Sequence, residues 1–179
     1  MSVSLKNGNQ YNEELTIQII ISYLSHQMTD TESKYDIKNL IPDDLYNNIN
    51  TDTNNYIFKN ANSSGLQHEV SVIVEAMLHM VAEFEKRYQS ELHAHLKSVT
   101  SDFNSNEVAS SYQDIILTLF DEKINAGRLV ALFAFLNATV VYLCEIEHVD
   151  IIKNIIHVTL NLFDTRLNKW IDENDGWVI

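Results

Sequence analysis

Apolar and polar residues recur with a helical period through most of this chain. Near the beginning, Leu15, Ile19 and Leu24 fall at intervals that place them on one face of a helix. The same periodicity predicts amphipathic helices in five segments: 11–27, 63–88, 89–99, 105–124 and 149–171. A chain built in this way is expected to bury its apolar helix faces in a bundle.

The segment Leu129–Cys144 differs from the others because it is apolar almost all round. Such a helix is expected to be surrounded by other helices. Asn125, a residue type that favours helix N-caps, precedes it, so we predict a central helix from about Asn125 to about Glu145. Asn137 and Thr139 interrupt the run, which is shorter than the roughly 18–20 apolar residues of a spanning helix.

A polar segment of about 28–65 separates the first helix from the second. It is rich in Asn, Asp and Thr and holds the only proline, Pro42. This composition predicts a long loop with one helical turn at about 42–47. The whole pattern predicts one all-α domain over residues 1–179, with six to eight helices around one hydrophobic helix.

Composition supports this picture and excludes some functions. Apolar residues make up 45% of the 179, and 4 glycines and 1 proline are fewer than turn-rich β folds use. The net charge of -13 argues against nucleic acid as a partner, because phosphate binding needs clustered Lys and Arg. The single cysteine, Cys144, excludes an intrachain disulfide and is expected to be buried.

Motifs for catalysis, cofactors or metals are not found in the sequence. It contains no glycine-rich phosphate loop, no nucleophile elbow and no distinctive pair of carboxylates, so we do not expect an enzyme or a cofactor. His93 and His95 point to different faces of a helix and cannot chelate one metal together. Met77 and Met80 fit either a core face or an adaptable binding surface.

Two motifs, in the right order, resemble those of the Bcl-2 family of apoptosis regulators. The stretch "LFDEKINAGRLVALFAF", 119–135, is similar to the family's first homology motif, in which Asn-Trp-Gly-Arg opens the central helix. The stretch "WIDENDGW", 170–177, is similar to the second motif, and "YNEELTIQIIISYL" to the family's first helix. Ala126 stands in place of the usual Trp, and Asp175 in place of the first Gly of a pair.

The resemblance implies a Bcl-2-like bundle with a surface groove that binds the amphipathic death-motif (Bcl-2 homology 3) helices of pro-apoptotic partners. Arg128 would pair with the aspartate of such a ligand, Asn125 would cap the central helix and bond the ligand, and Gly127 would let the ligand backbone approach. The alternative is an ion pair of Arg128 with Asp121 or Glu122 of the same chain. Mapped onto this sequence, the other groove residues are Phe84, Tyr88, Leu92, Ile115, Leu119, Val130, Ala131 and Phe135.

The stretch "MLHMVAEFEKRY", 77–88, helps to decide whether the chain resembles the pro-survival or the pro-apoptotic members of the family. Ligand and killer proteins carry Leu-x-x-x-Gly-Asp on this helix, but here the Gly-Asp positions hold Val81 and Ala82 or, in the other register, Ala82 and Glu83. A poor ligand helix favours a pro-survival, animal or viral homologue. A pro-apoptotic pore-forming member and a signalling adaptor that reuses the fold remain the alternatives.

The resemblance also implies a location. Family members often carry a hydrophobic anchor after the second motif, and this chain shows none in the two residues after Trp177. We therefore expect a cytoplasmic protein, which would lie at the mitochondrial outer membrane or another intracellular membrane if the full-length protein carries such a tail.

Overall fold

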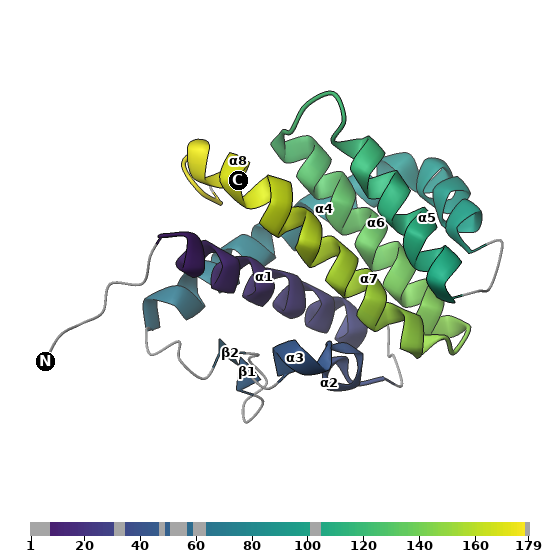
Figure 1. The fold of residues 1–179 in the computed structure, drawn as a ribbon, viewed down its shortest axis with the longest axis horizontal. Helices are drawn as coiled ribbons and strands as arrows, with labels where there is room; N and C mark the ends of the chain where they lie inside the picture. Colours follow the sequence, from purple (N-terminus) through teal and green to yellow (C-terminus); the bar gives the residue numbers. More distant parts are fainter. Residues whose placement is uncertain are drawn as a thin grey trace, which may run out of the picture.

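The helix α6, Ala126–Glu145, runs through the middle of the bundle in the computed structural model, which describes residues 8–30, 35–46, 49–50, 57–58, 64–100 and 105–177 (Figure 1). The Asn125 side chain caps its first turn by accepting a hydrogen bond from the backbone N–H of Arg128 at 2.9 Å. The predicted central helix is thus confirmed at both ends. Its buried residues are Leu129, Val130, Leu132, Phe133, Ala134, Phe135, Leu136, Asn137, Thr139, Val140, Leu143 and Cys144.

The other elements pack around α6. They are α1 (Gly8–Asp30), α2 (Ile37–Leu40), α3 (Asp43–Tyr46), β1 (Ile49–Asn50), β2 (Ile57–Phe58), α4 (Ser64–Val99), α5 (Ser105–Leu119), α7 (Val149–Leu162), a π-helical turn (Phe163–Leu167) and α8 (Asn168–Glu173). The longest helix, α4, makes its most extensive contact with α6, and α5 lies along α7. The predicted all-α bundle with an apolar central helix is confirmed.

The apolar helix α6 is buried inside the bundle. Among the described residues, α6 is the one helix that is long and apolar enough to cross a membrane. The helix is longer than the apolar run Leu129–Cys144, whose length in the sequence predicts no membrane span. Most of its residues are covered by neighbouring helices, as in the core helix of a bundle. Phe133 is fully buried and packs its ring edge-on against Tyr23 of α1, Phe163 and Trp177, with centroids 5.1–6.3 Å apart.

The predicted long loop is more structured than its composition indicated. α1 continues to Asp30, and α2 and α3 follow; α3 confirms the expected helical turn after Pro42. The Asp36 side chain caps α2 by accepting from the Lys38 N–H at 3.0 Å. Lys153 of α7 holds α3 through Asp43 at 2.6 Å. β1 and β2 pair antiparallel, two residues each. The sequence could not show the Lys153–Asp43 pair, because its two residues lie far apart in the chain.

The carboxyl end of the chain docks on the core, as its two tryptophans indicated. Trp177 is buried and stacks on Phe163, with ring centroids 5.7 Å apart, while Trp170 is partly buried. Asp175 and Gly176 make the turn into this contact with φ angles of 66° and 81°. Asp175, the departure from the family's Gly pair, tolerates this left-handed backbone because its short polar side chain can hydrogen-bond locally.

We predict that Phe133→Ala lowers the free energy of unfolding by about 3–5 kcal/mol, because it removes a large buried ring from the middle of the bundle. Urea denaturation followed by circular dichroism measures this loss. Val72→Ala, at an exposed position of α4, should change stability by less than about 0.5 kcal/mol. If Phe133→Ala does not fold, Ile155→Val should still cost about 0.5–1.5 kcal/mol. Equal stabilities for all variants would contradict the described core.

Candidate functional site

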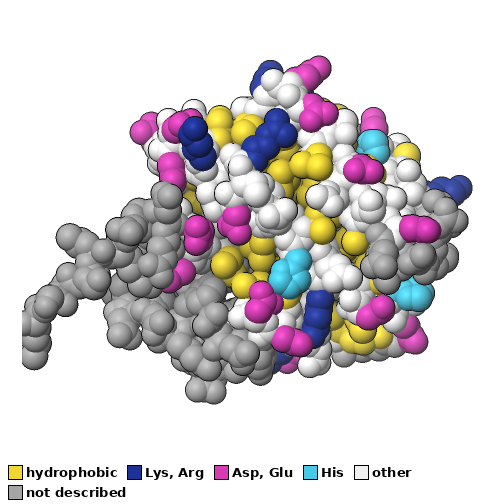
Figure 2. Space-filling model, viewed as in Figure 1, with side chains coloured by type: hydrophobic (Ala, Val, Ile, Leu, Met, Phe, Trp, Pro, Cys, Tyr) yellow, Lys and Arg dark blue, Asp and Glu magenta, His cyan; other side chains and the backbone are white. Residues whose placement is uncertain are grey.

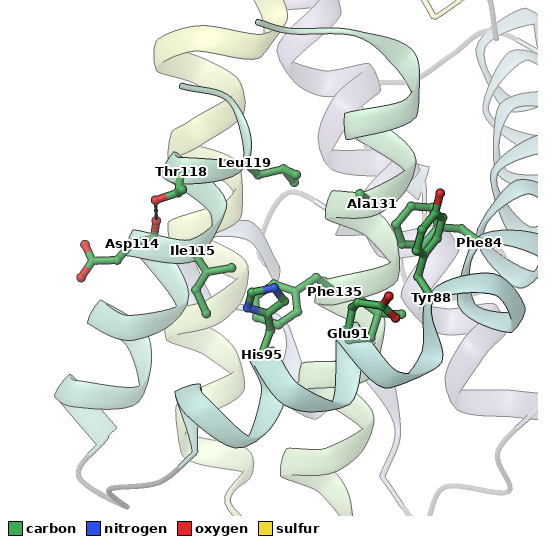
Figure 3. Close-up of a pocket in the computed structure, with 11 residues that line it drawn as sticks. Phe84, Tyr88, Glu91, His95, Asp114, Ile115, Thr118, Leu119, Ala131 and Phe135 are labelled. Carbon is green, nitrogen blue, oxygen red and sulfur yellow. Dashed lines mark hydrogen bonds between the residues drawn. The ribbon is translucent and has the colours of Figure 1, made fainter. Parts of the chain in front are cut away.

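A hollow of about 410 Å³ opens between α4, α5 and α6 (Figure 3). Its walls are mostly apolar, and α4 and α5 stand on either side of a floor formed by α6. We call it the α4–α6 pocket. Its lining residues are Phe84, Tyr88, Glu91, Leu92, His95, Asp114, Ile115, Thr118, Leu119, Ala131 and Phe135. Concave, mainly apolar sites with a few polar groups are where proteins usually bind ligands.

A bend in α4 shapes one wall of this pocket. Tyr88 leaves helical geometry, with φ -119° and ψ 26°, so α4 consists of two helical segments that meet at this residue. The bend separates the predicted helices 63–88 and 89–99. Tyr88 is 40% exposed, and its ring packs against that of Phe84 with centroids 4.6 Å apart. The Tyr88 ring is therefore exposed at the surface, and the Phe84 ring beneath it is partly buried against the core.

The floor of the pocket is rigid and hydrogen-bonded from behind. Phe135 stacks on Tyr112 of α5 with centroids 5.3 Å apart and ring planes 7° apart. The Tyr112 hydroxyl shares a hydrogen bond of 2.8 Å with Thr159 of α7. Burial raises the pKa of the Tyr112 phenol above its usual range, so this hydroxyl stays neutral. A fully buried, paired tyrosine fixes the orientation of the ring that faces the ligand.

Seven of the groove residues inferred from the sequence line the pocket together. They are Phe84, Tyr88, Leu92, Ile115, Leu119, Ala131 and Phe135. The structure adds polar residues that the sequence reasoning missed: Glu91, His95, Asp114 and Thr118. Helical spacing could have found them, because Glu91 and His95 continue the stripe that starts at Tyr88, and Asp114 and Thr118 flank Ile115 on the same face.

The remaining predicted residues lie elsewhere. Val130 belongs to the core and is not among the residues that line the pocket. Its position next to Ala131 on α6 turns it inward. Asn125, Gly127 and Arg128 lie at the start of α6, beyond the lining residues. Gly127 is exposed, and a Cβ there would meet only the Asn125 Oδ1, at 3.4 Å.

Arg128 has a partner inside the chain. Its Nη2 lies 3.0 Å from the Glu122 Oε2, and its Nη1 donates to the Lys123 carbonyl at 3.0 Å. One of the two intrachain pairs considered from the sequence is therefore formed. The Arg128 side chain is 23% exposed and that of Glu122 83% exposed. Such an exposed pair contributes under about 1 kcal/mol, so a stronger acidic partner could displace Glu122.

A second hollow of the same volume lies along another face of α4 and is more polar. Its lining residues are Ala82, Glu85, Lys86, Gln89, Leu92, His93, Leu96 and Ala138. His93 and His95 thus face different hollows, as their spacing indicated. In the described part of the chain, no three His, Cys, Asp or Glu side chains lie where they could hold a metal together. The α4–α6 pocket is the better candidate because its walls offer apolar area to a ligand.

Comparisons with known proteins bear on this arrangement. A family profile described as apoptosis regulator proteins, Bcl-2 family, matches residues 77–177, which include both motifs and all eleven lining residues. The chain belongs to the Bcl-2 family. Apoptosis regulator R11 of Xenopus laevis is 33% identical over 108 residues, 59% of this chain and 50% of its own length. Human Bcl-2-like protein 1 is 27% identical over 110 residues, 60% of this chain and 46% of its own.

Solved structures show the same fold over almost the whole chain. Chicken BOK has a TM-score of 0.69 at 11% identity, covering 96% of this chain and 95% of BOK. Trichoplax adhaerens trBcl-2L2 bound to trBak BH3 has a TM-score of 0.68 at 16% identity, covering 93% and 94%. Schistosome BCL-2 bound to ABT-737 has a TM-score of 0.65 at 24% identity, covering 92% of each.

These neighbours establish the fold, while the family profile establishes the class of apoptosis regulators. At these identities the structural likeness does not assign a function, so the resemblance to BOK does not decide between the two sides of the family. The chain spans about half the length of the curated relatives it matches.

We predict that Asn125→Ala lowers the free energy of unfolding of this Bcl-2 family protein by about 1 kcal/mol, because the first turn of α6 loses its side-chain cap. Asn125→Asp should keep most of the stability, since a carboxylate also caps and is favoured at a helix start. Urea denaturation compares the three proteins. If Asn125→Asp lowered the free energy of unfolding as much as Asn125→Ala does, capping would not be the role of Asn125 in the fold.

Proposed function

We propose that this protein is a pro-survival Bcl-2 family member that inhibits apoptosis by holding death-motif helices of pro-apoptotic partners in the α4–α6 pocket. The observation that carries the proposal is the joint placement of an apolar pocket and a cation. Arg128, Ala131 and Phe135 follow each other at i, i+3 and i+7, so they share a face of α6. An amphipathic helix could place an apolar anchor on the floor and an acidic residue beside Arg128.

The ligands of two structural neighbours support a binding role for the pocket, and one of these ligands is a death-motif segment. trBcl-2L2 was solved bound to trBak BH3, and schistosome BCL-2 to ABT-737. Both proteins have the fold of this chain. The pocket described above is open to solvent on one side, with Tyr88 exposed at its edge. Apolar side chains of a helix that lies across its mouth could enter it.

The pro-survival assignment rests on the helix α4 itself. Its position Val81, where a ligand helix would carry Gly in one register, is fully buried against the bundle. Met77 is buried as well, so the methionine belongs to the core, while Met80 is partly buried. A helix without the small and acidic pair is a poor ligand for another family member, which suits a protein that binds such helices rather than supplying one.

Calorimetry against a panel of death-motif peptides tests the proposed binding. The tightest peptide should bind with a dissociation constant on the order of nanomolar, or about -12 kcal/mol. Failure to bind any peptide would favour the adaptor alternative. Dye release from liposomes, with and without an activating peptide, separates a pro-survival protein from a pore-forming one. α6 is apolar enough for the second role, and strong peptide-dependent release would support it.

We predict that Arg128→Ala weakens binding of a death-motif peptide about thirtyfold or more. Losing one partner of a desolvated ion pair costs roughly 2–5 kcal/mol, and 1.4 kcal/mol is tenfold. Replacing the peptide's aspartate with alanine should cost a similar amount, and the two losses should not add. Calorimetry on this double-mutant cycle decides the matter. Additive losses would mean that Arg128 serves the fold and not the ligand.

Glu122→Gln is the matched control for this cycle, because it releases Arg128 from its intrachain partner without removing the guanidinium. It should leave stability within about 1 kcal/mol and should not weaken peptide binding. For location, we propose a cytoplasmic protein, which lies at the mitochondrial outer membrane or another intracellular membrane if the full-length protein carries a hydrophobic C-terminal tail. Fractionation of cells that express the full-length protein tests this.

A further inference from the structure

The mouth of the α4–α6 pocket carries two carboxylates, one on each wall. Glu91 belongs to α4 and Asp114 to α5, and both are exposed. Within the part of the chain that the structure describes, neither side chain forms an ion pair or a hydrogen bond. The lining includes neither Lys nor Arg. The pocket therefore combines an apolar floor with two carboxylates that form no ion pair among the described residues.

The positions of these carboxylates fit the sides of a bound helix. In Figure 3, Glu91 rises from the α4 segment beside Tyr88, Asp114 projects from the outer edge of α5, and Phe135 and Ala131 lie between the two walls. The Thr118 hydroxyl does not neutralise Asp114, since it donates to the backbone carbonyl of that residue at 2.8 Å. A helix with its anchor on the floor would turn its flanking residues toward both walls.

We propose that Glu91 and Asp114 determine specificity in this pocket, by selecting ligand helices that carry Lys or Arg one turn before or after the apolar anchor. This inference rests on the proposed function and names the chemistry of the preferred partner. Residues three or four positions from the anchor lie on nearly the same helix face, so they reach the walls while the anchor reaches the floor.

Electrostatics gives the reason for the selection. A helix that covers the pocket removes water from both carboxylates, and this costs free energy unless a partner replaces the water. A Lys or Arg beside the anchor of the ligand helix supplies that partner, and a neutral polar residue supplies a weaker one. An Asp or Glu at the same position is repelled by the two carboxylates. Charges elsewhere also matter, because Asp and Glu side chains are spread over the face that Figure 2 draws, with Lys and Arg among them, and the net charge of the chain is -13.

The same charges would set the register of the ligand. Arg128 lies one turn before Ala131 on α6, while Glu91 and Asp114 lie on the walls farther along the pocket. A ligand whose acidic residue meets Arg128 and whose basic residues meet the two carboxylates fits in one alignment. Sliding it by one turn would bring like charges together.

Three versions of one death-motif peptide test the proposal, with Arg, Gln or Glu at the two positions that flank the apolar anchor. The wild-type protein should bind the Arg peptide about tenfold tighter than the Gln peptide at pH 8, where imidazoles carry little charge. The Glu peptide should bind more weakly than either. Raising the salt to 0.5 M should narrow these differences, because exposed charges are screened.

Variants of the protein distinguish an effect of the two pocket carboxylates from an effect of the overall net charge of -13. The double variant Glu91→Gln, Asp114→Asn should lose most of the preference for the Arg peptide and should bind the Gln peptide at least as tightly as the wild-type protein, because no carboxylate is desolvated. Glu75→Gln with Glu83→Gln removes the same charge at exposed positions of α4 that do not line the pocket, and should keep the preference. Circular dichroism checks that all variants fold.

The outcomes of this experiment are distinguishable. A preference that survives the double variant, or that the control variant also removes, would overturn the inference while peptide binding itself stands. Equal binding of the Arg and Gln peptides by the wild-type protein would overturn it as well. If the wild-type protein binds none of the peptides, the proposed function fails and this inference fails with it.

Discussion

Burial of α6 is the constraint on which the rest of the structure depends. A helix of 20 residues that is apolar on nearly every side cannot remain in water, so the other helices must enclose it. Phe133 shows how completely they do so, since its ring meets α1, the π-helical turn and the carboxyl end of the chain. Segments that are distant in sequence are thereby brought to one core.

The pocket exists because this enclosure is incomplete at one place. The bend at Tyr88 turns the second segment of α4 so that Ala131 stays partly exposed between α4 and α5 and the pocket extends down to the buried Phe135. The stacking of Phe135 on buried Tyr112, and the hydrogen bond from Tyr112 to Thr159, fix the floor from behind. A rigid apolar floor costs little reorganisation when a ligand binds.

Charge is distributed unevenly around this floor. Arg128, at the start of α6, is held only by exposed Glu122 and a backbone carbonyl, while Glu91 and Asp114 stand without a described partner at the pocket walls. The apolar floor offers area for binding without distinguishing one apolar anchor sharply from another. Charged groups at the edge discriminate, because a wrong neighbour leaves a desolvated charge unpaired. In a Bcl-2 family protein, this is where a preference among ligand helices would be decided.

The sequence by itself determined the helices, the central position of α6 and the family, since periodicity, one capping residue and two motifs are local properties of the chain. The sequence also predicted seven of the pocket residues, because the groove positions of the family could be mapped onto the matching positions of this chain. Only the tertiary structure decided that Val130 is buried in the core and that Glu91 and Asp114 line one pocket from two helices. The ion pairs of Arg128 with Glu122 and of Lys153 with Asp43 also became known only from the structure. Each of these depends on how helices are rotated and bent against one another, and helical period alone does not fix that packing.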